Sequence, residues 1–166
     1  MCGNADVVVV SEANANTVAV FRRSDGALRR RFGCTGGGSG ELCNLGGLCF
    51  LSRDGDSHVA VEDSEFLNDR VSVFTVDGDF VRVVGVDVLK RPHGVACSAY
   101  DELAVADFGR RRVVVFSASG EVLSTNGDGY FTGVAMHNGV LYALDYEKKT
   151  CLVFVDWRCA FVMSRS

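Results

Sequence analysis

Four segments of the sequence share one pattern: a short apolar run ending in an acid, a polar loop, and a β-branched run ending in phenylalanine. The repeated acids are Glu12, Asp63, Asp107 and Asp145, and the repeated phenylalanines are Phe21, Phe74, Phe116 and Phe154. The phenylalanines are 53, 42 and 38 residues apart, which scatters around the period of four-stranded propeller blades. This recurrence restricts the chain to architectures made of repeated units.

Each repeat supplies four short strand-like segments. Hairpin turn residues such as Asp77-Gly78 and Ser119-Gly120 follow the phenylalanine, and a strand with its own glycine, such as 94–97, precedes the acid-ending run. No stretch shows a 3.6-residue apolar stripe, so we expect almost no helix. Several short strands separated by turns are typical of a sandwich, barrel or propeller, and the four-strand repeat favours an all-β propeller.

The repeat predicts about four blades, at residues 7–40, 41–85, 86–127 and 128–163. The first blade is expected to be incomplete, because Met1–Asp6 are too few to supply its innermost strand. Three arrangements stay open: part of a larger propeller, a half-propeller that pairs with a second copy, and a four-bladed ring. Exposed sheet edges would favour association in the first two.

Composition narrows the protein class. Hydrophobic residues make up 48% of the chain, which excludes disorder. The net charge of −4 is opposite to that of most proteins that grip phosphate backbones. Purely apolar runs such as Val7–Val10 are far too short to span a membrane, and no secretory leader is visible. The seven cysteines form no C-x-x-C pair, so we expect reduced thiols in a cytoplasmic protein.

The sequence resembles the NHL-repeat family of β-propellers over residues 7–162. The third repeat matches most fully. It has a Pro-His-Gly-Val-Ala segment at 92–96, a Val-Ala-Asp segment at 105–107, an Arg-Val-Val-Val-Phe segment at 112–116, and a glycine turn at 119–120. The fourth repeat departs from the pattern, since Trp157-Arg158 replace its turn glycine. The resemblance implies NHL-type blades, which commonly form six-bladed propellers.

One member type of this family is a metal-dependent lyase, in which a Pro-His pair on the innermost strand places histidine on the metal. Pro92-His93 matches that pair, but Gly46 and Thr132 stand at the corresponding positions of the neighbouring blades. A catalytic zinc needs about three protein ligands, so we expect no metal and no cofactor here. His93 is instead a candidate binding residue, lining the channel or bonding to backbone.

The four repeated acids could suggest a ring of carboxylates. An acid at a strand end can also accept hydrogen bonds from backbone N–H groups of the following loop. Because Glu12, Asp63, Asp107 and Asp145 occupy the same place in every blade, we assign them, with the four phenylalanines, a role in the repeat fold.

Two arginine triplets, at 29–31 and 110–112, are the strongest local basic features. Some NHL propellers bind RNA on a basic face, and Arg110 and Arg111 fall in a blade loop where such contacts arise. The acids nearby and the negative net charge favour ordinary solvated surface. Arg110 and Arg111 are therefore candidate binding residues for RNA or an acidic partner.

The function predicted from these features is a non-enzymatic scaffold that binds a protein or other macromolecule through propeller loops. No catalytic constellation is present in the pattern, and a fold alone does not define a function. Two alternatives stay open: a metal-dependent lyase or hydrolase that needs further blades, and an RNA-binding propeller face. A homodimer that completes one propeller is a further expectation.

Overall fold

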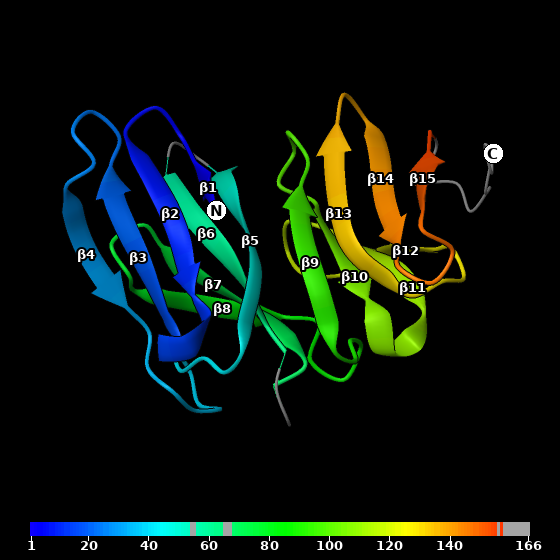
Figure 1. The fold of residues 1–166 in the computed structure, drawn as a ribbon, viewed down its shortest axis with the longest axis horizontal. Coiled ribbons are helices and arrows are strands. Elements are labelled where there is room, and N and C mark those ends of the chain that lie inside the picture. Colours follow the sequence, from blue (N-terminus) through cyan, green and yellow to red (C-terminus); the bar gives the residue numbers. More distant parts are fainter. Residues whose placement is uncertain (54–55, 65–67, 156, 158–166) are drawn as a thin grey trace. The chain divides into compact units, whose positions relative to one another are not determined.

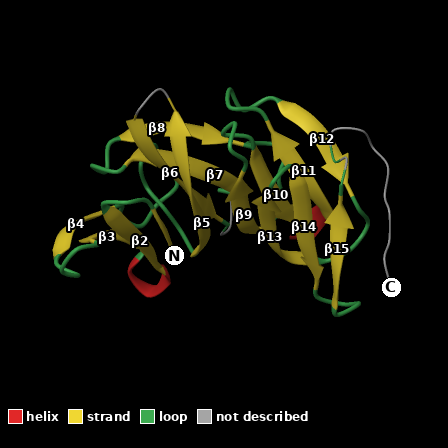
Figure 2. Cartoon of the chain, turned by 90° about the horizontal axis from the view of Figure 1, so that it is seen from above, coloured by secondary structure: helices red, strands yellow, loops and turns green. Residues whose placement is uncertain are grey.

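The computed structural model describes residues 1–53, 56–64, 68–155 and 157. These residues form fifteen strands in four antiparallel sheets (Figure 1). In each sheet, consecutive strands are neighbours, as in the up-and-down blades that the repeat predicts. Helix in the described part of the chain is confined to two single 3₁₀ turns, drawn red in Figure 2.

The chain divides into two compact units, residues 1–86 and 87–166. The first unit holds two four-stranded sheets. Their strands are β1 (Cys2–Gly3), β2 (Val7–Glu12), β3 (Thr17–Arg22), β4 (Leu28–Phe32), β5 (Leu45–Arg53), β6 (Asp56–Asp63), β7 (Arg70–Thr75) and β8 (Phe80–Val84). The turn η1 (Ala13–Ala15) joins β2 to β3.

The second unit holds a four-stranded and a three-stranded sheet. Their strands are β9 (Pro92–Cys97), β10 (Leu103–Asp107), β11 (Arg112–Phe116), β12 (Val122–Asn126), β13 (Phe131–His137), β14 (Val140–Asp145) and β15 (Thr150–Phe154). The turn η2 (Phe108–Arg110) joins β10 to β11. We number the sheets first to fourth in chain order.

Within each unit the two sheets pack face to face. The innermost strand β5 contacts β1 and β2, and β13 contacts β9 and β10. Figure 1 shows β9 and β13 side by side. A Cβ on Gly94 would lie 3.1 Å from the Cα of Gly133, so the absence of a side chain lets these two strands approach. Strands β10 and β11 are buried on both faces, which explains their continuous Val/Ala composition.

The repeated phenylalanines differ in burial. Phe74, Phe116 and Phe154 are at most 1% exposed, whereas Phe21 of the first sheet is half-buried. Phe74 packs in the core of the first unit, and Phe154 packs with Phe131 and Trp157 in the core of the second. The repeat therefore marks a core position most strongly in the last three sheets.

The prediction that the first sheet lacks its innermost strand is wrong. The two residues of β1 pair with β2, Cys2 opposite Val9 and Gly3 opposite Val8. The reversal is possible in so few residues because the Asn4 side chain accepts the N–H groups of Asp6 and Val7, which closes a tight turn. In the fourth sheet the described strands end at β15, and the outer strand expected near Val162 lies outside the described residues.

Candidate interaction face

Four loops of the second unit lie at one end of their sheets. They are residues 87–91 before β9, 108–111 after β10, 127–130 before β13 and 146–149 after β14. They meet because antiparallel strands alternate in direction, so every second connection falls at the same end. We call these four loops the loop face.

Backbone contacts hold the loop after β10 in its 3₁₀ turn. The Gly109 N–H donates to the Lys90 carbonyl at 2.8 Å, and a Cβ on residue 109 would lie 2.6 Å from that oxygen, so only glycine fits. Arg111 ends the turn in the left-handed conformation, at φ 58°, and its N–H donates to the Phe108 carbonyl. The Arg111 carbonyl accepts the Gly129 N–H at 2.9 Å. The backbone of Arg111 is therefore fixed from both sides.

The carboxylate of Asp107 anchors this loop end. Its side chain is fully buried, and its Oδ1 accepts the Lys90 N–H at 2.7 Å. Its Oδ2 accepts from the Nε of Arg112 at 2.8 Å, and Arg112 also donates to the Val88 carbonyl at 2.9 Å. A buried acid thus joins the incoming loop to an arginine of the next strand. We call this arrangement the clasp.

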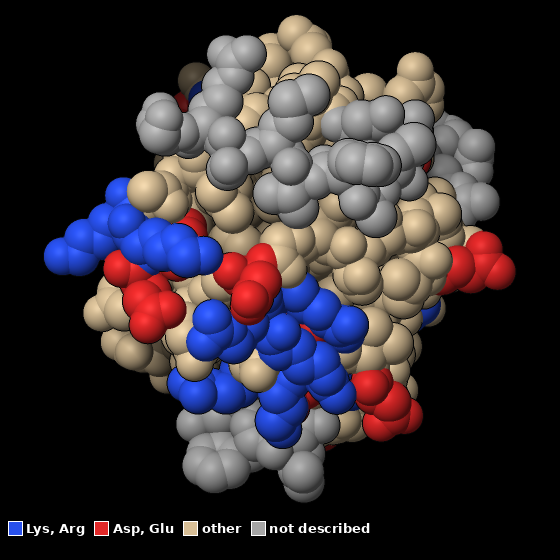
Figure 3. Space-filling view, turned by 90° about the vertical axis from the view of Figure 1, so that its right-hand side faces the viewer, with Lys and Arg blue, Asp and Glu red and all other residues tan. Residues whose placement is uncertain are grey.

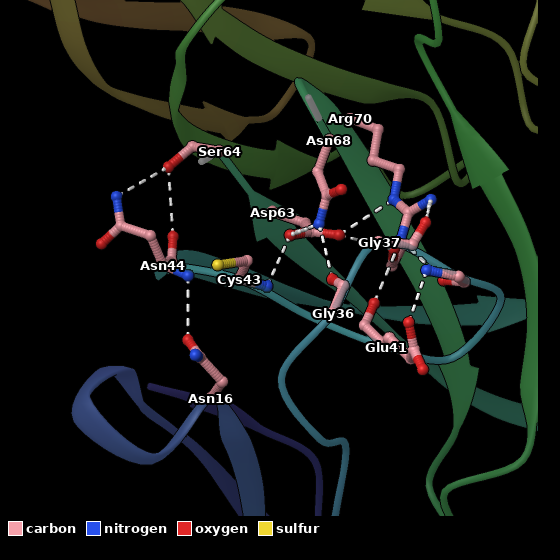
Figure 4. A network of polar contacts seen from close by, with 12 residues as sticks. Asn16, Gly36, Gly37, Glu41, Cys43, Asn44, Asp63, Ser64, Asn68 and Arg70 are labelled. Carbon is pink, nitrogen blue, oxygen red and sulfur yellow. Dashed lines mark hydrogen bonds and ion pairs between the residues drawn. The ribbon is translucent and has the colours of Figure 1, made fainter. Parts of the chain in front are cut away.

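The second sheet has the same clasp on Asp63 (Figure 4). Asp63 Oδ1 accepts the Cys43 N–H at 2.8 Å, and its Oδ2 accepts from the Nε of Arg70 at 2.9 Å. The Arg70 guanidinium also donates to three carbonyls of the incoming loop, those of Gly37, Gly38 and Glu41. The glycine-rich segment is therefore an ordered connection between sheets, held by one arginine.

The acids of the first and fourth sheets are held differently, because threonine stands where the clasps have arginine. Thr17 is opposite Glu12, and Thr150 is opposite Asp145. The Thr17 hydroxyl donates to Glu12 at 2.9 Å. Asp145 Oδ1 accepts the Lys148 N–H at 3.1 Å, and its Oδ2 lies 3.4 Å from the Lys148 ammonium. Asp145 thus braces its own hairpin, and Glu12 also accepts from Arg31 of β4 at 2.8 and 3.1 Å, whereas the clasps hold an incoming loop.

Three aromatic rings form a row on the loop face. The ring centroids of His93 and Phe108 are 4.8 Å apart, and those of Phe108 and Tyr130 are 5.1 Å apart. The Arg91 guanidinium lies 5.5 Å from the Phe108 centroid, and that of Arg111 lies 4.5 Å from the Tyr130 centroid. Both distances are in the range of cation–π attraction. We call these five residues the aromatic–arginine row.

Exposure within the row is graded. The side chains of His93, Arg91 and Arg111 are exposed, while the rings of Phe108 and Tyr130 are half-buried. The row therefore presents guanidinium groups to solvent on a partly buried aromatic base.

The loop face carries more positive than negative charge. Its exposed cations are Lys90, Arg91, Arg110, Arg111, Lys148 and Lys149, and its exposed acids are Asp87, Asp128 and Glu147. Six cations thus face three acids on a chain whose net charge is −4. Figure 3 shows Lys and Arg side chains gathered on one face of the molecule, with acidic side chains around them.

Local electrostatics set the charge states within the row. Partial burial, and secondly the charge of Arg91, lower the pKa of His93, which favours the neutral ring. Hydrogen bonding to Tyr130, and then to Asp128, raises the pKa of Arg111. The Arg111 Nε lies 3.2 Å from Asp128 Oδ1, and this carboxylate is 85% exposed.

The structure brings two of the three candidate binding residues together. His93 and Arg111 lie at opposite ends of the aromatic–arginine row. Arg110 is exposed, and its guanidinium donates to the Asp87 carbonyl at 3.5 Å. The other arginine triplet, Arg29–Arg31, lies exposed on β4, away from any blade loop.

Phe108, Tyr130 and Arg91 were missed by the sequence patterns. The signal for Phe108 was its position directly after the repeated acid, where the first and second repeats have Ala13 and Ser64. A bulky aromatic residue in a polar loop is a reason to suspect a binding role. Tyr130 and Arg91 carry no comparable signal, since only the fold brings them to Phe108.

The described residues contain no group of three or more His, Cys, Asp or Glu side chains that could hold a metal ion. The neighbours of His93 in the row are an aromatic ring and a guanidinium. In the part of the chain that the structure describes, no helix is long and apolar enough to cross a membrane.

Comparison with solved structures identifies the type of fold. A chain in the crystal structure of a nidogen/laminin complex superposes with a TM-score of 0.75 at 20% identity, over 96% of this chain and 58% of that one. A Bacteroides caccae protein of unknown function superposes with a TM-score of 0.69 at 14% identity, over 99% of this chain and 58% of its own. The fold is of the β-propeller type. At these identities the likeness concerns the fold alone.

Sequence comparison is less informative. No protein-family profile matches the chain. Over 116 residues, 70% of its length, the chain is 24% identical to the Drosophila melanogaster protein named brain tumor. The chain spans only 11% of that relative and 58% of each matched structure.

Proposed function

We propose that this chain is a non-enzymatic interaction scaffold that binds a partner protein through the loop face of its second unit. The aromatic–arginine row carries the proposal. Exposed arginine over aromatic rings is the composition enriched in binding hot spots of protein interfaces. The clasp and the fixed backbone of Arg111 hold these groups before a partner arrives, which lowers the entropy lost on binding.

The propeller-type fold supports this proposal, because its loops can vary while the sheets stay constant. The distant similarity to brain tumor, an NHL-repeat protein, also supports it. We further propose that the four sheets are NHL-type blades, with the boundaries 7–40, 41–85, 86–127 and 128–163, and that they are part of a larger propeller. Pairing of two copies stays a prediction, which light scattering after gel filtration tests.

A selection experiment tests the proposed function. A random peptide library is displayed against the immobilised chain, and the enriched peptides are measured against Phe108→Ala and against Arg30→Gln, a control on exposed strand β4. We expect enriched peptides whose affinity falls at least tenfold in the Phe108 variant, as for a hot-spot side chain, and stays unchanged in the control. If no peptide depends on Phe108, the loop face is not the binding surface.

RNA is a second candidate ligand, because aromatic rings and arginines lie together on the loop face, as they do on single-strand binding surfaces. Binding of mixed-sequence single-stranded RNA at low salt would support this function if Arg111→Gln weakened it. Negligible binding even at low salt would remove it from consideration.

A further inference from the structure

We propose that the aromatic–arginine row binds an extended, carboxylate-rich segment of a partner protein, and that Asp128 occupies the carboxylate position on Arg111 until the partner displaces it. This inference rests on the proposed function and specifies the chemistry of the partner.

The geometry of Arg111 suits a carboxylate. Its guanidinium lies over the Tyr130 ring, so one flat face is covered, and in the guanidinium plane its Nε N–H already donates to the Asp128 carboxylate. Planar guanidinium groups bind carboxylates through paired N–H donors. The Arg91 guanidinium lies 5.5 Å from the Phe108 centroid, so the row carries a second positive charge beside its rings.

Asp128 already shows the expected contact. Its Oδ1 lies 3.2 Å from the Arg111 Nε, with the two side chains 85% and 44% exposed. An exposed ion pair of this kind contributes little to stability, because water screens it. A carboxylate from a partner can replace Asp128 and restore the same contact, so displacement costs little.

The charge pattern favours an acidic peptide over a nucleic acid. Exposed acids Asp87, Asp128 and Glu147 lie among the six cations, where a continuous phosphate backbone would meet them. The Phe108 ring already has His93, Tyr130 and Arg91 within 5.5 Å. A base would have to displace one of these groups to stack there, whereas a carboxylate needs only the outward N–H groups.

Fluorescence anisotropy with two synthetic peptides tests this inference. One is a labelled ten-residue peptide of alternating Glu and Gly, and the other has Gln in place of each Glu. We expect the Glu peptide to bind at low salt and the Gln peptide to bind at least tenfold more weakly, because charge-assisted hydrogen bonds are lost.

Four variants locate the site. Arg111→Gln is expected to weaken the Glu peptide about tenfold, and Arg111→Lys several-fold, since lysine keeps the charge but not the paired donors. Asp128→Asn should strengthen binding several-fold, because the competing carboxylate is gone. Arg30→Gln should leave binding unchanged. Thermal melts of each variant establish that it is folded.

Several results would overturn the inference. Equal affinity for the two peptides, unchanged binding in Arg111→Gln, or weaker binding in Asp128→Asn would each contradict it. Tighter, Arg111-dependent binding of single-stranded RNA than of the Glu peptide would assign the row to nucleic acid. A third result would separate the two proposals. If the Glu peptide did not bind, while neutral peptides from the library bound in a Phe108-dependent way, this inference would be wrong and the proposed function would still hold.

Discussion

The 3₁₀ turns of the first and third sheets follow the same backbone path but carry different side chains. Each turn follows the repeated acid and ends in the left-handed conformation, at φ 51° in Asn16 and φ 58° in Arg111. In η1 the turn is Ala13–Ala15, three small residues, whereas in η2 Phe108–Arg110 brings a ring and a guanidinium.

The left-handed residue also ties each turn to the next sheet, by different means. The Asn16 side chain accepts the Asn44 N–H at 2.8 Å (Figure 4), so this side chain is committed to the fold. In η2 the backbone carbonyl of Arg111 makes the corresponding tie, to the Gly129 N–H. The side chain of Arg111 instead contacts Tyr130 and Asp128 on the loop face, where it is 44% exposed. Two turns with the same backbone conformation can thus carry side chains with different roles. Function must therefore be argued from the side chains of the site and not from the repeat.

Burial of the repeated phenylalanine gives the largest difference expected between these two sheets. Phe116→Ala should lower the free energy of unfolding by about 3–5 kcal/mol, because the ring is fully buried. Phe21→Ala should cost less than about 2 kcal/mol, since its ring is half-buried. Urea unfolding measures both values. Equal losses would mean that the two sheets are packed alike.

The next largest difference in stability between the first and third sheets is expected at the repeated acid, which is part of a clasp in the third sheet alone of the two. Asp107→Ala leaves the Lys90 N–H and the Arg112 guanidinium without their buried acceptor, so we expect a loss of about 3 kcal/mol. Glu12→Ala should cost much less, because its carboxylate is partly exposed and its arginine partner Arg31 is half-exposed. The same urea titrations decide the point: a loss at Glu12 as large as that at Asp107 would remove the distinction between clasped and unclasped sheets.

The second sheet differs from the first and third sheets in having a buried acid, Glu62, beside the repeated acid. Ser11 stands at this position in the first sheet, and Ala106 stands there in the third. Burial raises the pKa of Glu62 to about 7, even though hydrogen bonds from Gly47 and Ser64 act to lower it. The ordinary pKa of a glutamate is 4.5. Between pH 4.5 and pH 7, Glu62 therefore holds a proton in the folded chain that it has lost in the unfolded chain.

Stability from this group is consequently lost as pH rises through that range, by about 3 kcal/mol in total. Glu62→Gln should remove this dependence and be more stable than the parent chain above pH 7, with the two equal below pH 4.5. Urea unfolding of both chains from pH 4 to 8 gives the difference curve. A flat difference curve would show that Glu62 ionises as freely in the folded chain as in the unfolded one.

The sheets could be predicted from the sequence because each leaves a periodic signal. Alternating apolar runs and glycine turns mark strands directly, and positive φ angles at Gly26, Gly78 and Gly120 are the turn chemistry the pattern predicts. The two-residue strand β1 was missed because it is shorter than any period, and its formation depends on one side chain, that of Asn4.

The aromatic–arginine row could be predicted only in part. His93 and Arg111 stood out by their residue types, but the contact between Phe108 and Tyr130 joins loops that belong to different sheets. Such a contact follows from the packing of β13 against β9, which no local pattern in the sequence encodes.

One measurement tests the central claim, that the side chains of Phe108 and Arg111 at η2 serve binding, whereas those of Ala13 and Asn16 at η1 do not. The variant Phe108→Ala/Arg111→Asn gives these two positions the residues found at the corresponding positions 13 and 16 of the first sheet. Asparagine tolerates the left-handed conformation well. Its melting temperature and its affinity for a library-selected peptide are measured beside the parent chain. We predict a melting temperature lower by no more than about 4 °C, together with loss of peptide binding. Retained binding, or collapse of the folded state, would contradict the account.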